Sequence, residues 1–389
     1  MYRANNETRR AGWGRWGRIC ALTGALAITA ACQAPTDDGR QPRKDRVEVL
    51  FRVPMAGAGE TWAPATDGQR LYADVARRIE AFDLNTGARQ WSYARPKGGP
   101  SSLVVAGGRV MFAGDTAVAL EAATGRELWR RPLPAFAGFC ETDGTADAFY
   151  LGTTDHRVFA LNAADGSLLW ERDLGPDWEY RKGTVRGMTV SGDTVYAVVE
   201  HDTGINSHIG TGDTFALDRR TGQVLWHHRF GDGSGLSIYQ SAARVAGGLL
   251  LNTANGENTF VALDRFTGRE VWRVVGGASY FGPHEAPEVR GGVAFGAAHD
   301  QRAKAIDLAS GRVLWETPVP GGTIYMALCG RVLLANYLRV GVFDPETGEF
   351  LGQLRREPEN ESVHTDFVVV GNRAYIFSTH ALLALRCPV

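Results

Sequence analysis

One short pattern recurs along most of the chain and constrains its fold more than any other feature. The pattern is Ala-x-Asp-x-x-Thr-Gly-x-x-x-Trp, and it first appears from Ala81 through Gly87 to Trp91. Six close copies and one degenerate copy occur, with their turn glycines at positions 87, 125, 166, 222, 268, 311 and 348. Such a period, 37 to 56 residues here, indicates one array of similar supersecondary units.

Each part of the pattern predicts a β-hairpin. Asp or Asn can accept hydrogen bonds from the turn backbone, and Gly can adopt a positive φ. The flanking stretches, such as Val-Phe-Ala-Leu and Leu-Leu-Trp, consist largely of residues that favour strands. The tryptophan offers a large flat surface that can stack against the turn of the next unit. We therefore expect structural docking roles for Trp91, Trp129, Trp170, Trp226, Trp272 and Trp315.

Two more strands fit upstream of each turn. In the second repeat we expect strands at 102–107, 109–113, 117–120 and 127–131. No stretch longer than a turn or two has a helical pattern. The sequence therefore predicts an all-β fold, an eight-bladed β-propeller built from four-stranded antiparallel blades.

The two ends of the chain together supply the eighth blade. Residues 381–386 match the third strand of a blade, but no fourth strand follows them. Residues 48–54 resemble the fourth strand at 312–318, with Phe51 in the position of Trp315. We expect the N-terminal strand to close the last blade, which removes an exposed sheet edge. The predicted propeller spans residues 47–389.

The first 46 residues have the features of an export signal and a tether. Five arginines within residues 1–18 precede an apolar stretch, 19–31, that is too short to span a bilayer. Thr29-Ala30-Ala31-Cys32 resembles a bacterial lipobox, which implies cleavage before Cys32 and its acylation; an ordinary signal peptide cut nearby is the alternative. Residues 32–46 are polar and predict a flexible tether. We expect a protein anchored in a membrane by lipid, on its periplasmic or cell-surface side.

The five cysteines leave little room for disulfides. Cys20 is expected to leave with the signal peptide and Cys32 to be lipidated, so Cys140, Cys329 and Cys387 remain. Cys329 and Cys387 belong to neighbouring repeats, but we expect them at different distances from the propeller axis. Buried free thiols are therefore favoured over a disulfide.

The repeat resembles the tryptophan-docking motif of quinoprotein-type propellers, over residues 61–354. The size and the expected anchor are also similar to those of the propeller lipoproteins of the outer-membrane barrel-assembly machine. In that family, loops around blades three to five bind the partner, which corresponds here to residues 178–186. Quinoprotein alcohol dehydrogenases are longer and carry adjacent cysteines that pack on their cofactor. This chain has no such pair, so we predict no cofactor.

A polar binding face is predicted at one end of the propeller. The loops that join strands two and three and the loops that enter first strands lie on one face, and seven of the nine histidines fall in them. The candidate binding residues are Arg186, Tyr239, His284, Glu285, His299, Asp300, Tyr325, His364 and Asp366. The longest insert, 201–213 in blade four, carries His201 and His208, but its irregular spacing does not predict a metal site.

The sequence favours a binding protein over an enzyme. A net charge of −1 excludes the strongly basic nucleic-acid binders. Gly-x-Ser-x-Gly, a phosphate-binding glycine loop and His-Glu-x-x-His are all missing from the sequence. We predict a monomeric, non-catalytic scaffold or adaptor for a protein partner, with envelope protein assembly as its setting. The alternative is a small-molecule binder or quinoprotein-like enzyme using the central funnel, with Arg186, His284, His299, His364 and Asp366 as its polar groups.

Overall fold

The chain divides into two units, Met1–Gln33 and Ala34–Val389. The computed structural model describes residues 47–55, 64–96, 102–137, 141–175, 182–202, 210–230, 243–254, 259–275, 287–298, 302–319, 325–336, 339–354, 362–363 and 365–389. The predicted signal peptide, tether and Cys32 therefore lie outside the described residues. Within these ranges, no helix is long and apolar enough to cross a membrane.

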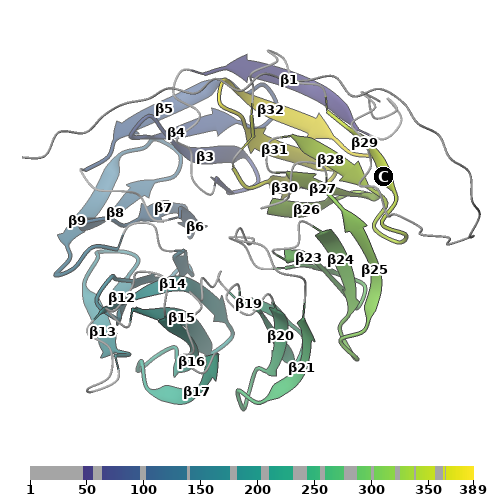
Figure 1. The fold of residues 1–389 in the computed structure, drawn as a ribbon. Helices are drawn as coiled ribbons and strands as arrows, with labels where there is room; N and C mark the ends of the chain where they lie inside the picture. The colour runs from purple at the N-terminus through teal and green to yellow at the C-terminus, as the bar shows by residue number, and fades with distance from the viewer. Residues whose placement is uncertain are drawn as a thin grey trace, which may run out of the picture. The chain divides into compact units, whose positions relative to one another are not determined.

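The second unit contains eight four-stranded antiparallel sheets arranged as the blades of a propeller ring (Figure 1). Blade one contains β2 (Ala65–Thr66), β3 (Arg70–Val75), β4 (Arg78–Asp83) and β5 (Arg89–Ala94), and blade two contains β6 (Val104–Ala106), β7 (Arg109–Phe112), β8 (Thr116–Glu121) and β9 (Glu127–Pro132). Blade three contains β10 (Asp143–Gly144), β11 (Ala148–Gly152), β12 (Arg157–Asn162) and β13 (Leu168–Asp173). Blade four contains β14 (Lys182–Ser191), β15 (Thr194–Asp202), β16 (Gly210–Asp218) and β17 (Val224–Phe230).

The remaining blades follow the same plan. Blade five contains β18 (Arg244–Ala246), β19 (Leu249–Ala254), β20 (Thr259–Asp264) and β21 (Glu270–Val275), and blade six contains β22 (Glu288–Arg290), β23 (Val293–Ala298), β24 (Arg302–Asp307) and β25 (Val313–Pro318). Blade seven contains β26 (Tyr325–Cys329), β27 (Val332–Asn336), β28 (Val340–Phe343) and β29 (Phe350–Gln353). Blade eight contains β30 (Val368–Val370), β31 (Arg373–Phe377), β32 (Ala381–Arg386) and β1 (Glu48–Pro54). The predicted all-β, eight-bladed fold is confirmed, and the four strands of blade two lie within two residues of the expected bounds.

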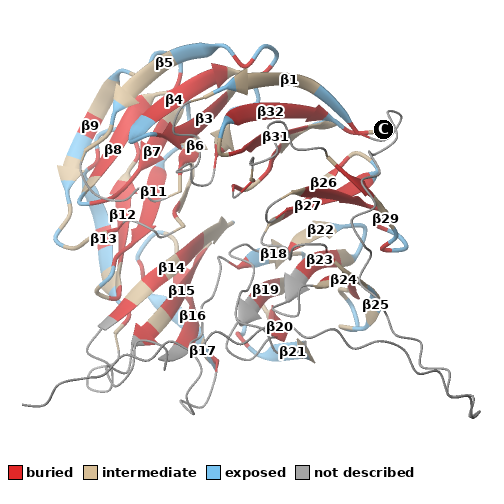
Figure 2. Ribbon diagram, turned by 45° about the horizontal axis from the view of Figure 1, so that its top comes forward, coloured by how far each residue is buried: buried red, intermediate tan, exposed pale blue. Residues whose placement is uncertain are grey.

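Burial follows the position of each strand in its blade. Middle strands such as β3 and β12 are almost wholly buried, whereas most residues of the outermost strands β5, β9 and β13 are exposed or half-buried (Figure 2). The apolar side chains of the middle strands pack between neighbouring blades. One cluster, for example, joins Tyr150 of blade three to Val195 and Val199 of blade four. Each blade therefore shares its buried apolar surface with the blade beside it.

Docking of the tryptophans joins successive blades. The turn of blade two has Gly125 at a φ of 71°, and a Cβ there would lie 2.5 Å from Cε3 of Trp91 in blade one. The indole Nε1–H of Trp91 donates to the carbonyl oxygen of Ala122 at 3.0 Å. Trp129, Trp170, Trp226, Trp272 and Trp315 make the same two contacts with the blade that follows each of them. Glycine is needed in each turn because any side chain would collide with the indole.

The N-terminal strand closes the ring, as the sequence predicted. β1 pairs antiparallel with β32, and Phe51 lies opposite Ala384. The Phe51 ring covers Gly87 of blade one, where a Cβ would lie 2.7 Å from Cε2 of Phe51. A phenyl ring has no N–H to donate, and the Tyr375 hydroxyl instead donates to the Leu84 carbonyl at 2.9 Å.

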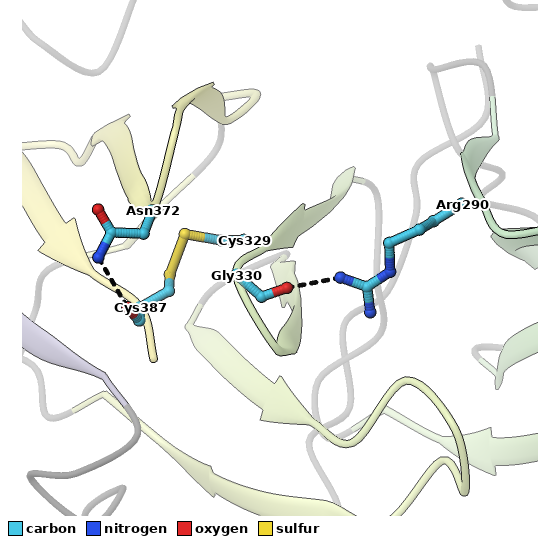
Figure 3. The surroundings of a disulfide bond; sticks show 5 residues. All are labelled: Arg290, Cys329, Gly330, Asn372 and Cys387. Carbon is cyan, nitrogen blue, oxygen red and sulfur yellow. Dashed lines mark hydrogen bonds between the residues drawn. A yellow bond between two sulfur atoms is a disulfide. The ribbon is translucent and has the colours of Figure 1, made fainter. Parts of the chain in front are cut away.

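Blades seven and eight are joined differently. Gly352 of β29 occupies the position of the docking tryptophan, opposite Val342. The covalent turn that would receive an indole is missing from blade eight, because β32 and β1 come from opposite ends of the chain. A disulfide between Cys329 and Cys387 joins these blades instead, with 5.7 Å between the two Cα atoms (Figure 3).

The expectation of free thiols at Cys329 and Cys387 was therefore wrong. Cys387 lies one residue beyond β32, where the chain has left the sheet and turned towards blade seven. There the Arg331 N–H donates to the Pro388 carbonyl at 2.9 Å. Figure 3 shows two flanking bonds, from Asn372 Nδ2 to the Cys387 carbonyl at 3.3 Å and from Arg290 to the Gly330 carbonyl at 2.5 Å. Arg290 belongs to blade six, so these contacts link three successive blades.

Candidate functional site

Three of the nine predicted binding residues are described, and they form two separate groups. Arg186 lies in β14 of blade four, whereas Tyr325 opens β26 of blade seven and Asp366 lies just before β30 of blade eight. Blades five and six lie between the two groups along the chain (Figure 1). The other six predicted residues lie outside the described residues: Tyr239, His284, Glu285, His299, Asp300 and His364.

Arg186 is held by its own blade. It sits at a β-bulge in β14, where the pairing with β15 shifts between Val185 and Gly187. Bulges redirect a side chain relative to the strand. The Arg186 Nε–H donates to Glu200 Oε2 at 2.5 Å, and about a third of the arginine side chain remains exposed. The Arg186 carbonyl accepts the N–H of Glu141 from blade three at 2.8 Å, so this position also ties two blades together.

The second group surrounds a buried asparagine. Tyr325 pairs with Asn336 across β26 and β27. The Asn336 side chain is fully buried, and its Nδ2 donates to the Thr365 carbonyl of blade eight at 2.9 Å. Asp366 accepts the N–H of Phe367 through Oδ1 at 2.5 Å. These bonds fix the backbone next to Asp366 and leave this carboxylate half-buried at the end of blade eight.

A buried histidine pair joins blades three and four beside Arg186. The loop between β11 and β12 pairs with β14: the His156 N–H donates to the Gly183 carbonyl at 3.0 Å, and the Val185 N–H donates to the Thr153 carbonyl at 3.1 Å. His156 has a φ of 68°, and its ring packs on Gly183, where a Cβ would lie 1.7 Å from Nε2. Only glycine at 183 allows the loop to dock in this way.

The histidine pair continues into a chain of polar contacts. His156 Nε2 lies 3.1 Å from His201 Nδ1, and His201 Nε2 lies 2.6 Å from Asp213 Oδ2. The Arg229 Nε–H donates to Asp213 Oδ1 at 3.3 Å. His201 and Asp213 are at most 1% exposed. Both ring nitrogens of His201 are therefore engaged, one by His156 of blade three and the other by Asp213 of its own blade four. These contacts hold blade four against blade three.

Burial and neighbouring charges set the protonation of this chain of groups. Burial lowers the pKa of His156, and the adjacent His201 lowers it further, although Asp173 and Asp155 oppose the shift. Burial alone would raise the pKa of Asp213, but hydrogen bonds from His201 and Arg229 bring it below its usual value. The arrangement therefore favours a neutral His156 and an ionised Asp213 at neutral pH.

The sequence placed His201 in a loop, and this was wrong. β15 runs to Asp202 and β16 begins at Gly210, so His201 and Asp213 lie within a long hairpin. The extension satisfies backbone N–H and C=O groups by pairing, for example between His201 and Thr211. The sequence analysis did not identify Glu200 and Arg229 as members of this site. Recognising that β15 and β16 are longer than in other blades would have placed both residues next to it, through the strand register. Among the described residues, no group of three metal-ligating side chains occurs.

The cysteines do not fit the quinone site that the quinoprotein resemblance implies. Such a site needs two adjacent cysteines that pack on the cofactor, and the sequence has none. Cys329 and Cys387 bond to each other across two blades. Cys329 lies at the end of the first strand of its blade, away from the loops that enter first strands. Both cysteines are thus held in this bond, and Cys140 lies outside the described residues.

Comparison with known proteins identifies the family. The sequence profile described as outer membrane protein assembly factor BamB matches residues 46–135, 75–251 and 210–385. The chain belongs to this family. The BamB protein of Yersinia pestis is 25% identical over 238 residues, which cover 56% of this chain and 56% of that protein. The chain thus matches a little over half the length of this curated relative.

Two further matches define how far the likeness extends. A quinoprotein ethanol dehydrogenase of Pseudomonas putida is 30% identical over 236 residues, covering 54% of this chain and 35% of that enzyme. The crystal structure of BamB from Moraxella catarrhalis superimposes with a TM-score of 0.65 at 16% identity, covering 87% of this chain and 97% of that one. At this identity, the structural likeness shows the fold alone.

Proposed function

We propose that the protein is a non-catalytic scaffold that binds a protein partner during outer membrane protein assembly. Its membership of the BamB family carries the proposal. The binding surface in this proposal is the loop-bearing end of blades three and four, beside Arg186.

The contacts around Arg186 support this choice of surface. The bulge, the Glu200 ion pair and the bond from Glu141 hold Arg186 in one position while leaving part of its side chain accessible. The His156–His201–Asp213 contacts fix the adjacent loop to blade four. A preformed surface with a partly exposed arginine suits protein recognition, because little side-chain freedom is lost on binding and arginine is enriched at binding hot spots.

Export and anchoring belong to the same proposal. Residues 1–31 would act as a lipoprotein signal peptide, Cys32 would carry the lipid, and residues 32–46 would tether the propeller to the membrane. The disulfide between Cys329 and Cys387 supports a location outside the cytoplasm, because disulfides persist in oxidising compartments such as the periplasm.

The test is affinity capture from crosslinked membranes with the full-length protein. Arg186→Ala is compared with the native protein and with Arg126→Ala, a matched control at the exposed turn of blade two. We expect a specific partner, identified by mass spectrometry, to be lost from Arg186→Ala and retained by the control. Equal capture by all three proteins would contradict the choice of surface. No specific partner for the folded native protein would contradict the scaffold function and favour the funnel as a small-molecule site.

A further inference from the structure

A groove of about 520 Å³ runs along the seam between blades eight and one. Val53 and Met55, from β1 and the residue after it, form one wall, and Phe82 of β4 lies on the other. Arg78, Glu80 and Arg89 supply its charged groups. The volume lies within the usual range of about 300 to 1,000 Å³ for ligand sites.

Comparison with blades three and four shows why this interface is open. Glu80 immediately precedes Ala81, which pairs with Trp91. The same position is occupied by the buried Phe159 in blade three and the buried Phe215 in blade four, and in the remaining blades by Val118, Val261, Lys304 and Gly341. At the seam, a glutamate stands where blades three and four have phenylalanine, and Phe51 replaces the docking tryptophan. Both differences remove aromatic bulk from the space between the blades.

The groove contains a buried carboxylate with one oxygen unused. Glu80 is 5% exposed, and its Oε1 accepts hydrogen bonds from Arg89 at 3.1 Å and from the Ser92 hydroxyl at 2.9 Å. Oε2 accepts no hydrogen bond from the described residues but is not fully buried, so a ligand in the groove can reach it. An ionised carboxylate oxygen accepts hydrogen bonds from N–H donors. A ligand that brings an N–H group into the groove would supply one.

Two arginines make the rim of the groove positive. The Arg78 Nε–H donates to the Ser92 hydroxyl at 2.6 Å, which orients its guanidinium beside Glu80. The Arg89 side chain is 62% exposed although it is paired with Glu80. Guanidinium groups bind carboxylates through paired hydrogen bonds. The rim therefore favours acidic groups, whereas Val53, Met55 and Phe82 favour an apolar one.

We propose that this seam groove binds an extended segment of a partner polypeptide, in which a large apolar side chain is flanked by acidic residues. The lining reaches from Ala76, at one end of β4, to Ala88 beyond its other end. Six strand residues extend about 20 Å, a shape that suits an extended chain better than a compact metabolite. The peptide N–H groups face Glu80, and the acidic side chains lie against Arg78 and Arg89.

The groove gives the scaffold a second binding surface, which is separate from the one beside Arg186. The seam lies between blades eight and one, and blades two and three separate it from β14 along the chain (Figure 1). One propeller could then hold a partner at blade four and an extended segment at the seam. Each surface can be altered without changing residues of the other.

The test uses three fluorescein-labelled, capped hexapeptides and the propeller with its disulfide intact. The acidic probe is Gly-Glu-Phe-Val-Glu-Gly; Gly-Lys-Phe-Val-Lys-Gly reverses its charge, and Gly-Glu-Ser-Ser-Glu-Gly removes its apolar side chains. Fluorescence anisotropy should show saturable binding of the acidic apolar probe, at least tenfold tighter than that of either other peptide. No saturable binding of this probe, or equal binding of all three, would overturn the proposal.

Variants locate the binding. Glu80→Phe copies the residue found in blades three and four, so it should fill the groove and weaken binding at least tenfold. Arg78→Glu should weaken it similarly, whereas Arg126→Glu on blade two is a matched charge reversal that should not. Thermal unfolding checks that each variant is folded. Undiminished binding by folded Glu80→Phe and Arg78→Glu would overturn the assignment, and Arg78→Glu decides alone if Glu80→Phe does not fold. Arg186→Ala should bind the probe normally, which separates this test from that of the scaffold function.

Discussion

Six blade interfaces in this propeller are joined in one way, and the two interfaces of blade eight are joined in others. At the six, an indole stacks on the turn glycine of the next blade and donates to a carbonyl of that turn. Between blades eight and one, Phe51 provides the stacking and Tyr375 the hydrogen bond. Between blades seven and eight, a disulfide replaces both.

The difference shows what the repeated tryptophan requires. An indole needs a covalent turn in the next blade, with glycine at its tip and a carbonyl in reach. Blade eight has no such turn, because its third and fourth strands come from opposite ends of the chain. The degenerate seventh repeat, with Gly352 in place of tryptophan, therefore follows from how the ring closes.

The largest expected effect comes from removing one docked indole. Trp129 is 8% exposed, so Trp129→Ala should destabilise the propeller by about 3–5 kcal/mol through lost burial and the cavity left behind. Chemical denaturation measures the loss. Leu169→Ala, at a side chain that is 51% exposed on an outer strand, should change stability by no more than about 0.5 kcal/mol. Similar losses in the two variants would mean that the indole does not join the blades.

Removing the disulfide should have the next largest effect. Replacing Cys329 and Cys387 by alanine should destabilise the protein by about 2–4 kcal/mol, because the unfolded chain gains conformational freedom. The C-terminal residues should also become sensitive to proteolysis. A reducing agent should destabilise the native protein but not the double variant. An unchanged unfolding midpoint in the double variant would show that blades seven and eight are held by packing alone.

The seam between blades eight and one can be made to resemble the other interfaces. Tyr375→Phe should cost about 1–3 kcal/mol, because the Leu84 carbonyl loses its donor in a buried site. Adding Phe51→Trp should recover about 1 kcal/mol by supplying an indole N–H. Blades four and five provide the precedent, since Tyr196 and Trp226 both donate to the Arg265 carbonyl. The four unfolding curves of this double-mutant cycle measure the coupling, and additive effects would contradict the shared carbonyl.

The fold was predictable because seven of the eight blades repeat the same local signals. Turn glycines, strand-forming flanks and the matching of residues 48–54 with 312–318 gave the blade number and the closure. The disulfide was not predictable in this way. It depends on where the chain turns after Arg386, and residues beyond the last strand carry no repeat pattern. The position of Cys387 is set instead by bonds to Asn372 and by the neighbouring bond from Arg331 to Pro388.

The site was predictable only in part, because the loops that form it differ from blade to blade. The rule for loop positions placed Arg186, Tyr325 and Asp366 at entries to first strands. Tyr325 opens β26 and Asp366 lies just before β30, but Arg186 lies inside β14, where it pairs with Glu200. It also treated residues 201–213 as one loop. Strand register decides these contacts, and a hairpin that extends by several residues changes which side chains become neighbours.

The smallest expected effect distinguishes the interface of blades three and four from the other docked ones. Its histidine pair adds a titratable contact to the docked indole. The pKa of His156 is lowered in the folded protein, so the unfolded chain takes up a proton first as the pH falls below about 6.5. The contribution of His156 to the free energy of unfolding should therefore be fully present above this pH and should decline below it.

Denaturation curves at pH 7.5 and pH 5.5 measure this decline, and His156→Asn tests its source. Asparagine tolerates the positive φ at this position but does not titrate. The variant should be less stable at pH 7.5, because the bond to His201 is lost, yet it should lose less on acidification than the native protein does. His380→Gln, at an exposed loop of blade eight, should keep the native pH dependence. If His156→Asn also kept it, the acid sensitivity would arise elsewhere, and the interface of blades three and four would differ from the others in geometry alone.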